Sequence, residues 1–168
     1  MAVDRPPLNA GIPLYMSCDD ESLSLYQCAV RRQIELFAAS AHDVDSSAQG
    51  RNKPIILGQV GIRCRHCCMM PVPHRARAAV YYPAKLTGLY QAAQNMATYH
   101  LLAEKGAGCQ HLPDSIREEL VGFTNQKTKR KKRKSSAGGG KQYWADGVRV
   151  LGVYESDNGL RFRGGPKP

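Results

Sequence analysis

The sequence contains few of the largest apolar side chains, with one Trp and three Phe among 168 residues. We therefore expect a modest hydrophobic core, which a bound metal ion could supplement. Hydrophobic residues still make up 42% of the chain and charged residues 23%, which is typical of a globular protein and excludes a chain that is disordered throughout. The length suits a single domain.

The sequence also lacks the apolar runs that direct a chain into or across a membrane. The first stretch, MAVDRPPLNAGIPLYMS, has no apolar core of a signal peptide, and no run elsewhere is long enough to span a bilayer. We expect an intracellular protein, in which the six cysteines are reduced or bound to metal rather than paired in disulfides.

The motifs of common enzyme classes are missing as well. The chain contains neither H-E-x-x-H nor G-x-S-x-G, and the stretch GGGK that ends at Lys141 lacks the remaining residues of a phosphate-binding loop. A catalytic zinc site needs a nearby carboxylate base, but no acidic residue lies between Arg51 and His100. We therefore expect no enzymatic activity.

The hydrophobic patterns predict an α+β fold, in which a small antiparallel sheet with a zinc knuckle packs against three to four helices. Residues 54–64 and 78–83 are rich in β-branched and aromatic residues, which favours two antiparallel strands, and residues 160–162 follow a turn signal as a terminal strand. Helical periodicity and capping signals predict helices over residues 24–39, from 86 to the glycine at 106, from 113 onward, and over 142–151.

These elements predict one zinc-stabilised domain over residues 21–163. Residues 1–20 contain several prolines and no amphipathic period, so they are expected to form a flexible arm. A basic flexible loop is expected at about residues 126–140, and residues 164–168 form a tail. Within the first helix, Arg31, Arg32 and Glu35 are placed on the outer face.

Four residues are predicted to bind one structural zinc ion: Cys64, Cys67, His100 and Cys109. A tight turn between Cys64 and Cys67 would aim both thiolates at one ion. His100 shares a helical face with Leu89, so it points toward the core in the last turn. Cys109 follows the helix end and can fold back as the fourth ligand.

Three thiolates and a neutral imidazole around a divalent ion leave one net negative charge. Three nearby cationic side chains could offset this charge, namely Arg63, Arg65 and Arg75.

The spacing leaves alternatives to this ligand set. Thirty-two residues separate Cys67 from His100, which is more than in compact zinc fingers. One of four neighbours could therefore replace a proposed ligand: His66, Cys68, His74 or His111. The Cys-x-x-Cys pair could instead serve thiol–disulfide exchange, although it lies between strands and not at the start of a helix. The cysteines could also be ordinary core residues, which is the interpretation we favour for Cys28.

Seven positive charges lie in one short segment, formed by Lys127, Lys129, Arg130, Lys131, Lys132, Arg133 and Lys134. The formal net charge is +10, so the rest of the chain carries only +3. Such a segment, followed by Ser and Gly residues, is typical of a nuclear-import signal. It can also bind phosphates with release of counterions, or remain a solvated loop.

The outer face of the helix that begins near residue 86 displays uncharged polar side chains, namely Gln91, Gln94, Asn95 and Thr98. Side-chain amides pair well with adenine edges in a major groove. Such residues are also the usual content of a solvated helix face, so this surface is a second, weaker hypothesis for nucleic-acid contact.

Five segments carry a resemblance to a known family: LSLYQCAVRRQIELFAA, GRNKPIILGQVGIRCRHC, AAVYYPAKLTGLYQAAQNMATYH, CQHL before PDSI, and GGGKQYWADGVRVLGV with NGLRF. They resemble a domain of an uncharacterised family of diatom-type algal proteins. The resemblance implies one compact domain in which Cys64, Cys67, His100 and Cys109 act as a unit, and it implies no function. The order of the ligands also resembles the zinc centre of the BIR domain, with a longer interval here and without its peptide binding.

Together these features predict a non-enzymatic zinc-binding module of the nucleus, which contacts DNA or acts in chromatin- or transcription-associated complexes. The nuclear import machinery is an expected partner, whereas a membrane and a small-molecule substrate are not. The alternative is a protein–protein interaction domain of the cytoplasm, with a structural zinc ion and no binding of nucleic acid.

Overall fold

Two antiparallel sheets and four substantial helices form the α+β fold that the sequence predicted. The computed structural model describes residues 11–46, 53–104, 106–129 and 140–165. The main sheet has the order β1-β2-β3-β4, and a separate hairpin pairs β5 with β6. The strands are β1 (Ile12–Pro13), β2 (Ile34–Ala38), β3 (Val60–Cys64), β4 (Val80–Tyr81), β5 (Val153–Ser156) and β6 (Gly159–Phe162).

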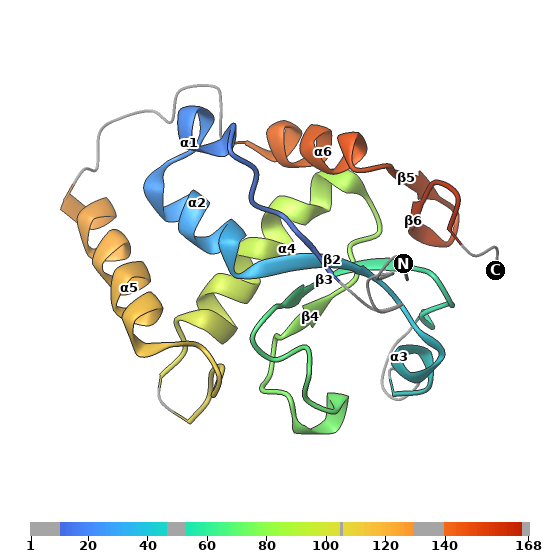
Figure 1. The fold of residues 1–168 in the computed structure, drawn as a ribbon, viewed down its shortest axis with the longest axis horizontal. Coiled ribbons are helices and arrows are strands. Elements are labelled where there is room, and N and C mark those ends of the chain that lie inside the picture. Colours follow the sequence, from blue (N-terminus) through green and yellow to red (C-terminus); the bar gives the residue numbers. More distant parts are fainter. Residues whose placement is uncertain (1–10, 47–52, 105, 130–139, 166–168) are drawn as a thin grey trace, which may run out of the picture.

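The longer helices gather around one face of the main sheet (Figure 1). Helix α2 contacts β2, and α4 contacts β3. Helix α5 packs on α2, and α6 packs on α4. The helices are α1 (Asp19–Ser22), α2 (Leu25–Arg32), α3 (Ala41–Ser46), α4 (Leu89–Met96), α5 (Asp114–Lys129) and α6 (Lys141–Val150), with 3-10 turns η1 (Val72–His74) and η2 (Leu86–Gly88) and a π-helical turn η3 (Ala97–Leu101). Within the described ranges, no helix combines the length and apolar character needed to cross a membrane.

Strand β3 is the centre of the fold, and all five of its residues are buried. Side chains alternate across a strand, so Val60, Ile62 and Cys64 share one face. All three belong to the hydrophobic core, together with Leu89 and Met96 of α4. The strand therefore delivers its last residue, Cys64, directly into the interface between sheet and helices.

The first helix is shorter than the sequence predicted. Ser24 caps α2 as expected, because its hydroxyl accepts a hydrogen bond from the Gln27 N–H at 3.2 Å. The helix ends at Arg32, and residues 34–38 form β2 instead of two further helical turns. Ile34 and Leu36 are both fully buried two positions apart, and pairing with β3 outweighs the helical periodicity of the sequence.

The predicted outward position of Arg31 is also wrong. Its side chain is 1% exposed and forms an ion pair with Asp19, whose carboxylate lies 2.6 Å from Arg31 Nε. The Arg31 guanidinium also donates to the Leu14 carbonyl oxygen and lies 4.5 Å from the centre of the Trp144 ring. A cation can be buried in this way because these groups replace part of its water shell, and only Nη1 of the guanidinium finds no hydrogen-bond partner among the described residues.

Part of the predicted flexible arm is ordered. Residues 12–13 pair with β2, and Leu14 is 1% exposed, while residues 19–22 form α1. The buried Arg31 explains this difference, because its two hydrogen-bond acceptors, Asp19 and the Leu14 carbonyl, both come from residues 14–19. Residues 1–10 of the predicted arm lie outside the described residues.

The remaining predicted elements are present. Strand β4 pairs antiparallel with β3, α5 begins at Asp114, and α6 buries Trp144 and Val148. Of the predicted basic loop, the backbone of residues 126–129 continues α5, and residues 130–139 lie outside the described ranges.

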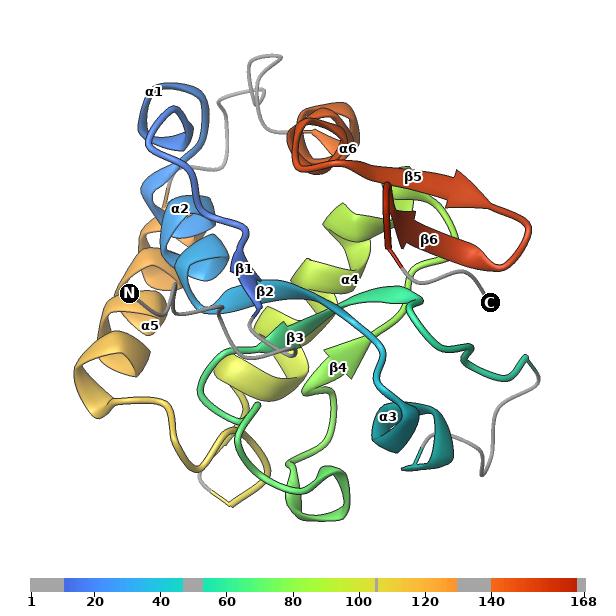
Figure 2. The ribbon, with the colours of Figure 1, turned by 45° about the vertical axis from the view of Figure 1, so that its right-hand side comes forward.

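The carboxyl-terminal hairpin packs beside α6 and reaches back to the main sheet (Figure 2). The turn before residue 160 and the terminal strand after it, now β6, were predicted correctly. The strand that pairs with β6, β5, was missed. A bridge between Gln59 and Arg161 joins the hairpin to the residue that precedes β3. Gly159 has a φ of +86°, which glycine adopts without steric cost, and a Cβ there would lie 2.7 Å from the Gln59 Nε2 atom.

Candidate metal centre

The structure brings the four predicted ligands, Cys64, Cys67, His100 and Cys109, into one buried group that could hold a metal ion. Their donor atoms all lie within 4.8 Å of one another, and the four side chains are buried. The Sγ atom of Cys109 lies 3.9 Å from that of Cys64 and 3.1 Å from that of Cys67. Two sulfurs that share a tetrahedral zinc ion at about 2.3 Å would be about 3.8 Å apart. The Cys64–Cys109 distance matches this value and the Cys67–Cys109 distance is shorter, so the group has nearly the dimensions of a metal shell.

Backbone hydrogen bonds hold the turn that carries the first two cysteines. The Cys64 N–H donates to the Ala79 carbonyl at 2.9 Å, and the Arg65 N–H donates to the Gln33 carbonyl at 3.0 Å. At the other side of the turn, the Met70 N–H donates to the Cys67 carbonyl at 2.9 Å. The turn is therefore an extension of the sheet, and its backbone hydrogen bonds position both cysteines.

His100 lies in the π-helical turn that extends α4, and it is fully buried as the helical phase predicted. Its Nδ1 atom lies 3.0 Å from the Arg77 carbonyl oxygen. Because a carbonyl can only accept, the hydrogen of the neutral ring lies on Nδ1, and Nε2 presents its lone pair to the cysteines. Nε2 is 3.4 Å from Cys67 Sγ. Metal-binding histidines are usually oriented by a second hydrogen bond of this kind.

The loop between η3 and α5 folds back so that Cys109 faces His100. The Cys109 N–H donates to the His100 carbonyl at 3.0 Å. The approach requires glycine at position 108, because a Cβ there would lie 2.5 Å from the same carbonyl oxygen. The sequence suggested a helix stop at this point, but it gave no sign of so close a contact.

Arg117 of α5 fixes the same loop from outside, and the sequence gave no signal for this role. Its guanidinium donates to the Ala103 carbonyl and to the Cys109 carbonyl, both at 2.8 Å. Helix α5 is thus joined to the residue that supplies the fourth donor atom. Its backbone includes Lys127 and Lys129, the first cations of the basic segment.

The three thiols share their protons unequally. Hydrogen bonds to Cys109 raise the pKa of Cys64, with a further contribution from Cys67, and raise the pKa of Cys67 to about 11. Hydrogen bonds from Cys64 and Cys67 lower the pKa of Cys109. The directions of these shifts favour the negative charge of the hydrogen-bonded group on the Cys109 sulfur. A raised pKa on both members of the Cys-x-x-Cys pair opposes the redox interpretation, which needs a reactive thiolate.

The four alternative ligands lie outside the buried group. His66 Nε2 is 2.7 Å from the Gln33 side-chain oxygen, and the Cys68 thiol donates to the Arg65 carbonyl at 3.1 Å. The side chains of His74 and His111 are exposed. All six cysteines are free of disulfides, and Cys28 is a buried core residue as predicted.

The three arginines that were expected to offset the charge of the centre differ in their partners. The guanidinium of Arg75 donates to the Met70 and Cys68 carbonyls. The hydrogen bond with Cys109 raises the pKa of Cys67, and the positive charge of Arg75 only partly opposes this rise. Arg63 forms an ion pair with Glu35 at 2.7 Å, and Arg65 donates to the Arg32 carbonyl. Of the three, Arg75 is therefore the arginine that holds the cysteine turn by two hydrogen bonds.

Comparison of the chain with family models, with curated proteins and with solved structures gives no match. The resemblances to the algal family and to the BIR-type centre therefore stay predictions. The assignment of the buried group to metal binding depends on its geometry.

Proposed function

We propose that Cys64, Cys67, His100 and Cys109 bind one zinc ion as a closed structural centre of a non-enzymatic module. The observation that carries this proposal is the convergence of three sulfurs and one oriented imidazole within 4.8 Å in the protein interior. Thiolate and imidazole donors in this number suit tetrahedral zinc, and calcium and magnesium prefer oxygen. Four protein ligands leave no open coordination position, which favours a structural over a catalytic ion.

The ion would join two layers of the fold. Two ligands extend from β3, and the other two lie on η3 and in the loop before α5. Zinc binding would therefore contribute directly to the free energy of folding, which suits a chain with one Trp and three Phe.

We further propose that this module contacts DNA through its basic segment, residues 127–134. Seven cations within eight residues can displace the counterions of a phosphate backbone. Helix α5 leads into the segment, and Arg117 of this helix donates to the Cys109 carbonyl, so the segment would be attached to the candidate metal centre. The same segment has the composition of a nuclear-import signal, so we propose a nuclear protein.

A salt titration tests the contact with DNA. Binding of the zinc-loaded chain to random-sequence duplex DNA should weaken steeply with salt, with a slope of log K against log salt of roughly −4 to −6 if most of the seven cations contact phosphates. Replacing the seven cations by Gln should abolish the slope and leave the zinc content unchanged. Absence of binding by the unaltered chain at low salt would favour the alternative, a protein–protein interaction domain.

Import is tested separately in cells. A fluorescent fusion of the full chain should accumulate in the nucleus, and the fusion with seven Gln substitutions should not. Equal distribution of the two fusions would contradict a nuclear-import role for the segment.

A further inference from the structure

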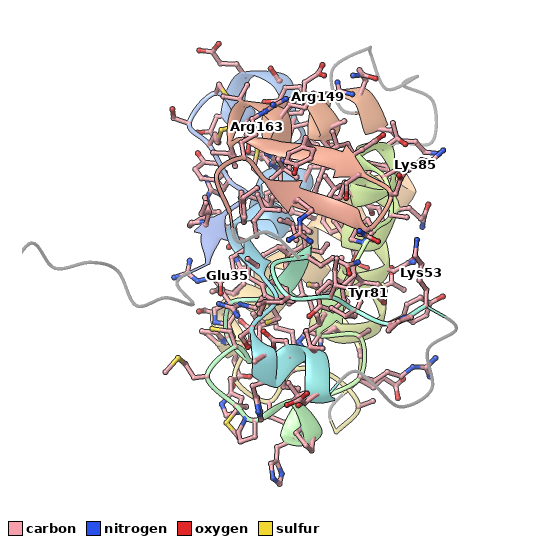
Figure 3. All side chains as sticks on the ribbon, turned by 90° about the vertical axis from the view of Figure 1, so that its right-hand side faces the viewer. Glu35, Lys53, Tyr81, Lys85, Arg149 and Arg163 are labelled. Carbon is pink, nitrogen blue, oxygen red and sulfur yellow. The ribbon has the colours of Figure 1, made fainter. Side chains whose placement is uncertain are left out.

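A groove of about 600 Å³ runs along the edge of the main sheet, between the end of β4, the η2 turn and α4. Aromatic, cationic and amide side chains line it, namely Tyr81, Tyr82, Lys85, Lys141, Gln91 and Asn95, and the remaining lining residues are small or apolar. None of the described residues that line it is acidic. Figure 3 shows Tyr81 and Lys85 along the same edge of the molecule.

The ring of Tyr82 is held rigidly at this edge. It packs edge-on against Phe37, with the ring centres 5.5 Å apart. It also passes over Gly61 of β3, where a Cβ would lie 2.8 Å from the Tyr82 Cδ1 atom. Glycine usually weakens the interior of a strand, and here it provides the space that the ring needs. The groove therefore contains an aromatic surface that loses little entropy when a partner stacks on it.

The two amides across the groove are paired. Gln91 Nε2 donates to Asn95 Oδ1 at 3.0 Å, one helical turn apart on α4. Each amide has a carbonyl and an NH₂ group, so this pair keeps a carbonyl oxygen on Gln91 and an NH₂ group on Asn95 for a further partner. One acceptor next to one donor is the pattern that the edge of a nucleobase requires.

Lys85 and Lys141 supply the charge of the groove. Both lysines are exposed, and they come from segments more than fifty residues apart, before η2 and at the start of α6. Since the part of the lining that the structure describes contains no carboxylate, these two ammonium groups favour an anionic partner.

We propose that this groove binds single-stranded nucleic acid, with a base stacked on Tyr82 and the backbone phosphates near Lys85 and Lys141. The inference deepens the proposed function and rests on it, since it takes nucleic acid as the partner of the module. A single strand fits better than a duplex because an aromatic surface can stack only on a base that is free of its own stack.

Fluorescence anisotropy with a labelled oligothymidine of about twelve nucleotides tests the proposal, with a duplex of equal length beside it. Tyr82→Leu removes the aromatic face and should weaken single-strand binding roughly five- to hundred-fold, whereas Tyr82→Phe should retain it. The surface variant Lys85→Gln with Lys141→Gln is expected to fold normally, and it should reduce the salt slope by about 1.4. The matched control is Lys53→Gln, an exposed lysine on the same side of the molecule but outside the groove (Figure 3).

The outcomes separate this proposal from the contact made by the basic segment. Unchanged single-strand affinity in both Tyr82→Leu and the double lysine variant would contradict single-strand binding by the groove. The proposed DNA contact of the basic segment would not be affected by this result. Loss of duplex and single-strand binding to the same extent in the lysine variant would overturn it as well. If the unaltered chain binds neither oligonucleotide at low salt, the groove and the proposed DNA contact are both wrong.

Discussion

The Nε2 atom of His100 lies 3.4 Å from the Sγ atom of Cys67, although 33 positions separate the two residues in the chain. Cys67 follows the central strand β3, and His100 lies at the end of the helical segment that covers it. A metal ion between these two atoms would therefore cross-link the sheet to its helical layer. Leu89 and Met96 of α4 join the same core through apolar contacts, so the ion would add a strong directional link to this interface.

Removing one ligand should release the ion and destabilise the fold. Cys109→Ser replaces a thiolate by a poor zinc ligand, and we expect loss of bound metal together with about 5 kcal/mol or more of stability. Metal analysis and urea unfolding measure the two effects. Cys68→Ser is the matched control, because Cys68 follows Cys67 directly but lies outside the buried group. Equal metal content in the two variants would contradict the assignment.

Zinc binding should release protons from two of the three cysteines. Hydrogen bonding raises the pKa of Cys64 and of Cys67, so both thiols are protonated near neutral pH, whereas the pKa of Cys109 is lowered. We expect about two protons per zinc ion at about pH 7.5, and weaker binding as the pH falls, because protons compete for the thiolates. Calorimetry in buffers of different ionisation enthalpy measures the number of protons released per zinc ion. Release of less than about one proton would argue against thiolate coordination.

Arg117 should tune the metal centre without touching the ion. Arg117→Leu removes the two hydrogen bonds to the carbonyls of Ala103 and Cys109, and we expect zinc affinity to fall about 10- to 100-fold. A competitive chelator titration measures this change. The exposed neighbour Glu118 offers the control substitution Glu118→Gln, which should have no effect. Equal affinities would show that α5 does not support the centre.

The buried group of Cys64, Cys67, His100 and Cys109 was predicted from the sequence to a greater extent than the fold around it. The ligands follow from local signals: a Cys-x-x-Cys turn, the helical phase of His100 and a cysteine after a glycine stop. Helical phase is reliable over residues 86–100 because a single helix covers most of them. The π-helical turn at Ala97–Leu101 changes the helical phase only in the last residues of this segment, so His100 still faces the core.

The errors occurred where long-range pairing decides the structure. Residues 34–38 have a helical spacing of apolar side chains, but β3 pairs with all five of them. The strand β1 and the burial of Arg31 depend on contacts between segments that are distant in the sequence, such as Asp19 with Tyr143. No local pattern indicates which arginine of a helix will find a carboxylate elsewhere in the chain.

The buried ion pair of Asp19 and Arg31 offers a further test of the fold. Asp19→Asn leaves a buried guanidinium without its counter-ion, and we expect a loss of about 3–5 kcal/mol. The adjacent pair of Asp20 and Arg32 lies 3.5 Å apart and is 54% and 44% exposed, so Asp20→Asn should cost less than about 1 kcal/mol. Chemical denaturation measures the free energy of unfolding of both variants. Similar losses would show that Asp19 is solvated in solution.

Two glycines should respond to alanine in opposite ways. A Cβ at Gly61 would lie 2.7 Å from the Tyr81 carbonyl oxygen, so Gly61→Ala should destabilise the protein by about 1–3 kcal/mol. Gly122 lies within α5, and a Cβ there would meet no atom of another segment within 4 Å, so Gly122→Ala should stabilise the protein by about 0.5–1 kcal/mol. Thermal unfolding of both variants shows whether each substitution raises or lowers the stability of the protein. A stabilising Gly61→Ala would contradict the close packing of β4 on β3.

Elemental analysis of the purified protein, combined with X-ray absorption at the zinc edge, tests the metal centre most directly. We predict one zinc ion per chain with a shell of three sulfurs near about 2.3 Å and one nitrogen near about 2.0–2.1 Å. A folded protein that contains no metal, or a zinc ion surrounded by oxygen, would contradict the account.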